Sequence, residues 1–203
     1  MSVDYVQKTA LVLVDLQNDY FPGGRWTLEG VDQATAQAKK LLEVFRAHQL
    51  PIIHIQHINS AAEAPFFVEG TAGADIHPKV SPEYSEEVVI KNQVNSFQGT
   101  DLNRLLKDKG IESIVICGAM SHMCIDAITR AGKDFGYHCT VIHDGCATLG
   151  MEFNGISVPA EHVHAAFMAA LEFGYADVFS TDFFLSRLMT ASPSQVQSKV
   201  AEN

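Results

Sequence analysis

Short apolar runs recur along the chain, and each is separated from the next by a longer segment. The runs are continuous rather than alternating, which is typical of parallel strands that are buried on both faces of a sheet. The pattern predicts six strands, at residues 9–15, 51–57, 87–91, 112–118, 138–143 and 176–180.

The segments between these strands carry apolar residues at intervals of three and four. In the first of them, Ala34, Ala38, Leu41 and Phe45 fall on one stripe, so one face of this helix is apolar. Strands that alternate with helices indicate an α/β fold, in which helices cover both faces of a parallel sheet in three layers. The predicted helices lie at residues 32–49, 101–109, 123–136 and 159–174.

Two segments fall outside this alternation. Residues 58–86 form a connection that is too long for an ordinary loop, and such connections are usually functional lids or disordered. The tail from about residue 191 has weak apolar content, so we expect it to fray or to pack on a partner subunit. Because no linker or repeat interrupts the alternation, we expect one domain over residues 1–203.

Composition and charge narrow the class of protein. Hydrophobic residues make up 47% of the 203 residues and charged residues 19%, which predicts a folded core. No apolar run is long enough to cross a bilayer, and the first residues lack a signal-peptide pattern, so we expect a cytoplasmic protein with no membrane partner. The formal net charge of -10 argues against a nucleic-acid partner.

Three chemically reactive side chains follow three different strands. Asp15 ends the first strand, Lys91 ends the third, and Cys124 begins the helix after the fourth. Because ligands bind beyond the carboxyl ends of parallel strands, we expect this acid, base and thiol to meet at one edge of the sheet. The start of a helix favours a thiolate and offers N–H groups to an oxyanion, and a nearby lysine favours the thiolate further. The combination predicts a nucleophilic site.

Each candidate has an ordinary alternative. A single Asp at a strand end is often a turn residue, a single Lys is usually solvated, and a single Cys is usually a small buried hydrophobic residue. His54 and His57, three apart in a strand, point to opposite faces, so we expect a core histidine and a residue at the pocket edge. His122 is expected either against substrate or toward solvent. His164 is expected to pack, with a Cys–His dyad as the second choice.

Three segments resemble the isochorismatase-like cysteine hydrolases: DLQNDYF at 15–21, KNQVNSF at 91–97 and ICGAMSHMCIDAITRAGKDFGY at 116–137. The third segment departs mildly from the family pattern, because Ile128 stands where a hydroxyl residue is usual. The resemblance covers about residues 8–182. It implies a Rossmann-like sheet of six parallel strands in the order 3-2-1-4-5-6.

The resemblance also implies a catalytic arrangement. The Asp, Lys and Cys triad of the amidase members falls on Asp15, Lys91 and Cys124. A cis peptide bond of the family falls between Ala119 and Met120. In the family this bond helps to aim the N–H groups of Met120 and Cys124 at the substrate carbonyl oxygen.

The cysteine decides between branches of the family. The name-giving isochorismatases lack the nucleophilic cysteine, so Cys124 points to the amidase branch, which includes nicotinamidase and N-carbamoylsarcosine amidase. This branch implies hydrolysis of a small-molecule amide or carbamoyl C–N bond through a thioester. The nicotinamidase metal site uses an Asp-x-His pair after the second strand, and HIQHINS at 54–60 has no Asp. We therefore expect no metal and no cofactor.

Substrate contacts are expected around the triad. By resemblance, Gln17 and Tyr20 lie near the site, and Tyr20 or Phe67 is expected to stack on a planar substrate. Asn92 is expected to hydrogen-bond a polar end of the substrate, and His122 is a further candidate contact. Two other functions stay open: a small-molecule-binding protein without turnover, and a redox sensor that uses Cys124 with a second cysteine, Cys146.

Apolar residues outside the predicted core suggest association. Relatives are commonly dimers or tetramers, so we expect a homo-oligomer whose contact lies near the 58–86 connection or the C-terminal segment. Clustered exposed apolar residues usually mark contact surfaces. The residues that motivate this expectation are Phe66, Phe67, Phe183, Phe184 and Leu185.

Overall fold

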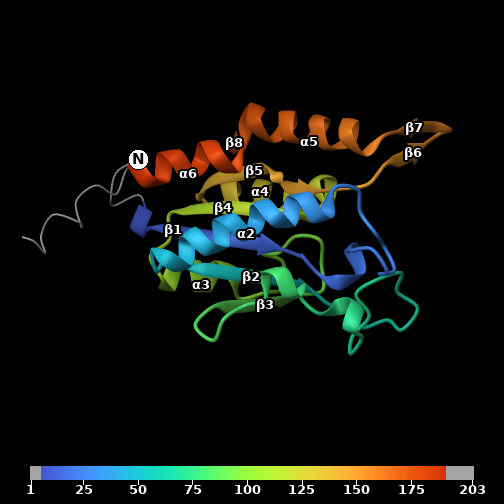
Figure 1. Ribbon diagram of the computed structural model, residues 1–203, viewed down its shortest axis with the longest axis horizontal. Coiled ribbons are helices and arrows are strands. Elements are labelled where there is room, and N and C mark those ends of the chain that lie inside the picture. The colour runs from blue at the N-terminus through green and yellow to red at the C-terminus, as the bar shows by residue number, and fades with distance from the viewer. Residues whose placement is uncertain (1–5, 191–203) are drawn as a thin grey trace, which may run out of the picture.

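The structure is a computed structural model that describes residues 6–190. The predicted fraying tail lies outside the described residues. Six parallel strands form one sheet in the order β3-β2-β1-β4-β5-β8, which confirms the predicted fold class and strand order (Figure 1). The strands are β1 (Thr9–Val14), β2 (Ile52–His57), β3 (Glu87–Lys91), β4 (Ser113–Ala119), β5 (His138–Ala147) and β8 (Asp177–Phe179).

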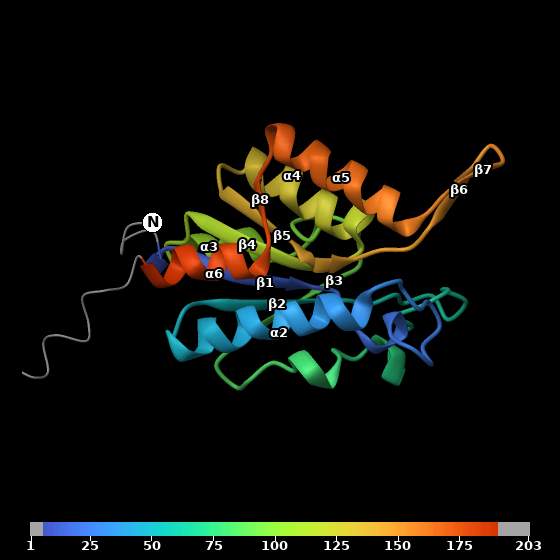
Figure 2. The same ribbon diagram turned by 45° about the horizontal axis from the view of Figure 1, so that its top comes forward.

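Helices cover both faces of this sheet. The helices α2 (Val31–Ala47) and α6 (Thr181–Thr190) lie over one face (Figure 2). The opposite face is covered by α3 (Leu102–Asp108), α4 (Asp126–Asp134) and α5 (Ala160–Gly174). Each face has its own apolar core, because successive side chains of a strand point to opposite faces.

A hairpin of two short strands was not predicted. The strands β6 (Met151–Phe153) and β7 (Ile156–Val158) pair antiparallel, and they are joined by Asn154 and Gly155 at φ of 52° and 75°. An Asn-Gly pair with positive φ is the favoured tight turn of a hairpin. Figures 1 and 2 both show the hairpin extending away from the body, beyond the N-terminal end of α5.

Two of the rings that we expected outside the core lie inside it. Phe184 faces the sheet from α6, a helix that was not predicted, and Phe67 is also fully buried. The expectation that these two rings form an exposed contact surface is therefore wrong. Phe183, on the outer side of α6, remains exposed.

A buried ionic cluster fixes the end of the long connection. Glu86 accepts a hydrogen bond from Nε of Arg46 at 2.6 Å, and its other oxygen lies 2.8 Å from Nε2 of His54. His54 is buried in β2, as expected for a core histidine. Residues 58–86 contain two short turns of helix, η2 (Ala72–Ala74) and η3 (Pro78–Val80), so this connection is folded.

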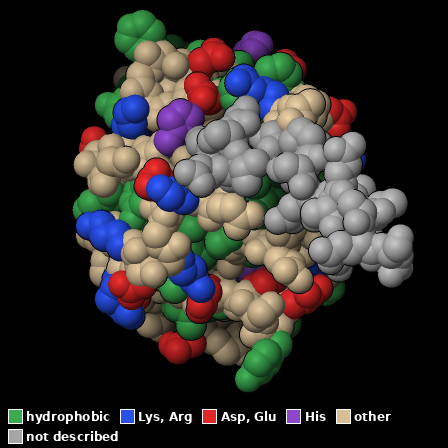
Figure 3. Space-filling view, turned by 90° about the vertical axis from the view of Figure 1, so that its left-hand side faces the viewer, with side chains coloured by type: hydrophobic (Ala, Val, Ile, Leu, Met, Phe, Trp, Pro, Cys, Tyr) green, Lys and Arg blue, Asp and Glu red, His purple; other side chains and the backbone are tan. Residues whose placement is uncertain are grey.

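One side of the molecule shows charges of both signs. On the side drawn in Figure 3, Lys and Arg side chains are interspersed with Asp and Glu. Within residues 6–190, none of the helices has the length and apolar character needed to cross a membrane.

Candidate active site

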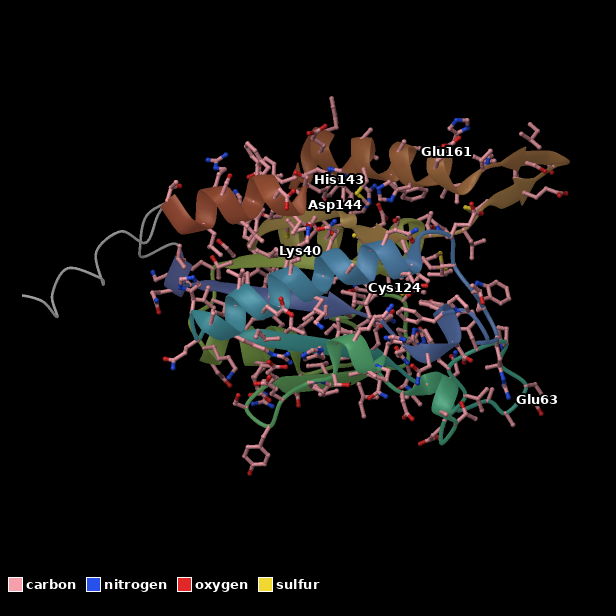
Figure 4. All side chains as sticks on the ribbon, viewed as in Figure 1. Lys40, Glu63, Cys124, His143, Asp144 and Glu161 are labelled. Atoms are coloured by element: carbon pink, nitrogen blue, oxygen red, sulfur yellow. The ribbon has the colours of Figure 1, made fainter. Side chains whose placement is uncertain are left out.

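The carboxyl ends of β1, β3 and β4 bring together the three predicted reactive side chains. Nζ of Lys91 lies 2.8 Å from Oδ2 of Asp15 and 3.0 Å from Sγ of Cys124. Asp15 and Lys91 are 0% exposed and Cys124 is 4% exposed. Figure 4 shows Cys124 near the ends of the central strands. An acid, a cation and a thiol thus share one closed site.

Asp15 occupies an unusual backbone position. Its φ is 52°, in the left-handed region that few residues other than glycine adopt, although Asp tolerates it better than most. This conformation turns the chain sharply after β1. One carboxylate oxygen faces Lys91, while Oδ1 is buried without a hydrogen-bond partner among residues 6–190. That oxygen is therefore available to accept a proton.

Lys91 directs its ammonium at three acceptors. Besides Asp15 and Cys124, Nζ donates to the carbonyl oxygen of Val94 at 3.1 Å. Burial alone lowers the pKa of Lys91, but the negative charges of Asp15 and of an ionised Cys124 outweigh it, and the net pKa is raised. The side chain therefore stays a cation at neutral pH.

Cys124 lies in a π-helical turn, Ser121–Ile125, that precedes α4. Burial and the negative charge of Asp15 raise the pKa of its thiol, and Lys91 opposes them without cancelling them. Lys91 thus favours the thiolate, as expected, but burial and Asp15 determine the net direction of the thiol pKa. The resting group is a neutral thiol, which needs a base to become a nucleophile.

β1 and β4 approach each other closely just before the reactive residues. Gly118 has a φ of 130°, and a Cβ built at this position would lie 2.0 Å from the carbonyl oxygen of Val14. Only glycine fits this contact. The close approach fixes Asp15, the residue after Val14, relative to the turn that follows β4.

The turn that carries Cys124 makes side-chain contacts with α5 and with the residue that follows β5. The peptide bond between Ala119 and Met120 is cis, as the resemblance implied. Oγ of Ser121 lies 2.8 Å from Nδ1 of His164, and Nδ1 of His122 lies 2.6 Å from Oγ1 of Thr148. His122 thus has a protein partner, and His164 has a polar contact that a purely packing role does not include.

Two of the predicted substrate contacts bond to the backbone. Both N–H groups of the Gln17 amide are donated, to the carbonyl oxygens of His57 and Ala74, and Oε1 accepts from the His57 N–H. The Gln17 side chain therefore pins the 58–86 connection to the loop after β1. Asn92 donates to the carbonyl oxygen of Ile58 at 2.7 Å.

The aromatic candidates pack against each other. The rings of Tyr20 and Phe67 lie 4.5 Å apart and both are buried. The Phe67 N–H donates to Oδ2 of Asp19 at 2.7 Å, a contact that the sequence did not reveal. A stacking role for Phe67 on an open pocket wall is not supported, because its ring is already covered.

His57 completes a group that resembles a metal site. Ligand atoms of Asp15, His57 and Cys124 lie within 4.8 Å of one another, so three potential ligands meet, whereas we expected His57 only as a residue at the pocket edge. The Lys91 ammonium contacts two of the three ligands. A divalent cation there would face this fixed positive charge at short range, so the donor set fits a metal poorly.

Comparison with known proteins places the chain in a family. The Isochorismatase domain matches residues 9–182. An uncharacterised isochorismatase family protein of Bacillus subtilis, YddQ, is 48% identical over 177 residues, which are 87% of this chain and 98% of that protein. The solved structure of a hydrolase of the family from Oleispira antarctica is 52% identical, with a TM-score of 0.86, and the match covers 92% of this chain and 99% of that one.

A third relative carries a named activity. The ureidoacrylate amidohydrolase RutB of Azorhizobium caulinodans is 23% identical over 181 residues, which are 73% of this chain and 80% of that protein. The chain belongs to the isochorismatase family.

Proposed function

We propose that the protein hydrolyses the C–N bond of a small-molecule amide or carbamoyl compound through a thioester on Cys124. The position of Lys91 carries the proposal, because its ammonium contacts both the Asp15 carboxylate and the Cys124 sulfur. A proton that moves from the thiol to the carboxylate leaves a thiolate beside the same cation. The negative charge therefore stays in contact with the Lys91 ammonium before and after the proton transfer.

The first half of the reaction acylates the cysteine. Asp15 takes the Cys124 proton, and the thiolate attacks the carbonyl carbon. The N–H groups of Met120 and Cys124 stabilise the oxyanion. The C–N bond breaks as Asp15 returns the proton to the leaving nitrogen, which departs as ammonia or an amine.

The second half releases the acid. A water molecule loses a proton to Asp15 and attacks the thioester carbonyl carbon. The C–S bond then breaks, the carboxylic or carbamic acid leaves, and the proton on Asp15 returns to Cys124. One carboxylate thus serves as base, acid and base again, and Lys91 stays protonated throughout.

The proposed substrate is small because the reactive side chains are almost completely enclosed. Asn92 and His122 stay proposed contacts at the rim, and Tyr20, whose ring is buried, stays a proposed contact inside the enclosure. Gln17 acts by holding the surrounding loops. The name of the relative RutB supports the choice of an amide bond, since that protein is an amidohydrolase.

A panel of small amides, carbamoyl compounds and ureas tests the proposal by ammonia release. We expect turnover of at least one compound, and loss of more than 99% of it in Cys124→Ala with an unchanged melting temperature. The matched control is Cys139→Ala, which removes another buried thiol. Cys139 lies near the N-terminal end of β5, away from the carboxyl ends of the strands that carry the reactive residues.

Two outcomes contradict the proposal. If the protein binds a panel compound but turns over none of the compounds, it is a small-molecule-binding protein. An internal disulfide between Cys124 and Cys146 after peroxide, seen by mass measurement with no amidase activity, indicates a redox sensor.

A further inference from the structure

His57 is a buried histidine that lies beside the reactive groups. It ends β2, pairs with Lys91 of β3 in the sheet and is 9% exposed. One of its ring nitrogens lies within 4.8 Å of a carboxylate oxygen of Asp15 and of Sγ of Cys124. A titratable ring thus adjoins both groups that exchange the proton in the proposed reaction.

The position of His57 is fixed by its neighbours. Oε1 of Gln17 accepts a hydrogen bond from the His57 N–H at 2.7 Å, and Nε2 of the same amide donates to the His57 carbonyl oxygen at 2.8 Å. The centroid of the imidazole lies 6.0 Å from that of the buried Phe67 ring. The two backbone bonds and the aromatic neighbour together keep the imidazole in the site.

The imidazole of His57 is neutral near pH 7. Burial lowers its pKa and the Lys91 ammonium lowers it further, whereas Asp15 and a hydrogen bond with the Asn59 side chain raise it without cancelling the decrease. Nδ2 of Asn59 donates to the carbonyl oxygen of Phe66, so Oδ1 accepts from the His57 ring. A neutral imidazole has one N–H and one acceptor nitrogen. Because Asn59 takes the N–H, the other ring nitrogen is an acceptor.

His57 is poorly suited to take the proton of Cys124. That transfer would create an imidazolium beside the Lys91 ammonium, and two like charges would then face each other in a buried site. A proton on Asp15 creates no second cation, because it neutralises a carboxylate. The chemistry of the site therefore favours His57 as a hydrogen-bond acceptor and Asp15 as the base.

The spacing of Asp15 and His57 suits one bridging water molecule. A water that donates both hydrogens, each to an acceptor about 2.8 Å from its oxygen, holds these acceptors about 4.5 Å apart. The carboxylate oxygen and the ring nitrogen lie within 4.8 Å of each other. Oδ1 of Asp15 is buried and has no hydrogen-bond partner among residues 6–190, so it can accept one of the two hydrogens.

We propose that His57 is a catalytic residue of the second half of the reaction, in which its acceptor nitrogen holds the water that hydrolyses the Cys124 thioester. This inference rests on the proposed function. The water donates one hydrogen to His57 and the other to Asp15, which leaves a lone pair of its oxygen to attack the thioester carbonyl carbon.

The proton balance of this step passes through Asp15. The new C–O bond forms as the water proton moves to Asp15, the C–S bond then breaks, and the proton returns from Asp15 to the sulfur. His57 holds the water without becoming charged. The first half of the reaction does not need this contact, because Asp15 alone moves the proton from Cys124 to the leaving nitrogen. Loss of the acceptor should therefore slow hydrolysis of the thioester and leave its formation intact.

Rapid-quench measurement of ammonia release tests the inference with a compound that the wild type turns over. We expect His57→Phe to release about one ammonia per chain in a burst, as an accumulating acyl-enzyme does. Turnover should then be roughly ten- to hundredfold slower than in the wild type. Intact-mass measurement in the slow phase should show the substrate, less ammonia, on Cys124. His57→Met repeats the test with a side chain that adapts its shape, in case the phenyl ring disturbs the fold.

Two glutamine variants complete the test. His57→Gln, whose amide oxygen can accept the water hydrogen, should restore most of the turnover and accumulate little thioester. The matched control is His54→Gln, which changes another buried histidine of β2, one that contacts Glu86, and should accumulate no thioester.

The failure of this inference differs from the failure of the proposed function. If the wild type releases ammonia and the folded His57→Phe and His57→Met proteins match its rate, His57 does not hold the water. Loss of the burst together with the slow phase would place His57 in the first half of the reaction, and it would also overturn the inference. Absence of turnover by the wild type with every compound would overturn both.

Discussion

The Nδ1 atom of His164 lies 2.8 Å from Oγ of Ser121, and that hydroxyl donates to the carbonyl oxygen of Ala147 at 3.3 Å. A hydroxyl has one proton to donate, so Nδ1 of His164 carries the hydrogen of the shorter contact. Burial lowers the pKa of His164, and nearby His143 lowers it further, so the ring is neutral near pH 7. α5 thus holds the turn that carries Cys124 through one oriented imidazole.

Replacing His164 by Ala should therefore misplace the turn that carries Cys124. We expect kcat to fall roughly ten- to hundredfold, the loss that a misplacement of about 1 Å produces, with a smaller change in KM. His164→Asn, whose amide N–H can take the place of the ring N–H, should restore most of the activity. The control is His48→Ala, which changes an exposed histidine at the end of α2. Equal losses in the Ala and Asn variants would show that the hydrogen bond is not responsible.

Asp15→Asn and Lys91→Met should shift the thiol pKa of Cys124 in opposite directions. Asp15 raises that pKa and Lys91 lowers it, so the first variant lowers the pKa and the second raises it further. Below its pKa, a thiol is alkylated about tenfold faster for each pH unit gained. At a fixed pH, iodoacetamide should therefore react faster with Asp15→Asn than with the wild type, and more slowly with Lys91→Met.

Both variants should nevertheless lose turnover, by roughly 10²–10⁴-fold for the missing proton transfer in Asp15→Asn. Circular dichroism checks folding, since each variant leaves one buried charge without its partner. The double variant keeps neither charge and serves as the folded reference. Alkylation rates that move in the same direction in both single variants would contradict the assigned roles.

Activity should survive prolonged treatment with EDTA or 1,10-phenanthroline. The three potential ligands Asp15, His57 and Cys124 surround a site that already contacts the Lys91 ammonium. The measurement is turnover before and after chelation, with metal content followed by mass spectrometry. Loss of activity that zinc or iron restores would instead assign His57 to a metal.

Glu86 should contribute stability that is lost in acid. Burial alone raises the pKa of Glu86, but hydrogen bonds from Arg46, the Glu83 amide and His54 outweigh it and lower the pKa from 4.5 to about 2. A carboxylate with a depressed folded-state pKa stabilises the fold above its unfolded pKa, and this contribution disappears as the pH falls from about 4.5 toward 2.

Urea unfolding at a series of pH values tests this contribution. Glu86→Gln should be less stable than the wild type at pH 7, and the difference should shrink between pH 5 and pH 2. The control is Glu112→Gln, which changes an exposed carboxylate paired with Lys8. A constant difference across that range would show that ionisation of Glu86 is not the cause.

The sheet and the reactive triad could be predicted because both follow from continuous apolar runs. Such runs mark strands buried on both faces, and the residue that ends each run must lie at the edge of the sheet. Asp15 and Lys91 were located in this way. The hairpin was missed because its strands are only three residues long, although the Asn154-Gly155 pair was a usable signal.

The sequence could not predict how deeply individual side chains are buried. The thiol pKa of Cys124 is raised mainly because neighbouring segments enclose it. The extent of this enclosure cannot be predicted from the amino-acid sequence. Phe67 and Phe184 read as loop residues because their segments lack a clear period, yet tertiary packing buries both. The bond from Gln17 to the carbonyl oxygen of Ala74 could not be predicted either, because the path of the 58–86 connection has no sequence signature.

Gly118 sets a limit for anyone who wishes to redesign this site. Randomised libraries aimed at new substrates usually vary every residue around a nucleophile, and position 118 is a natural choice. Any side chain there would collide with the carbonyl oxygen of Val14 and push apart the two segments that carry the carboxylate and the thiol. Libraries should therefore keep this glycine constant and randomise residues in the loops that surround the site.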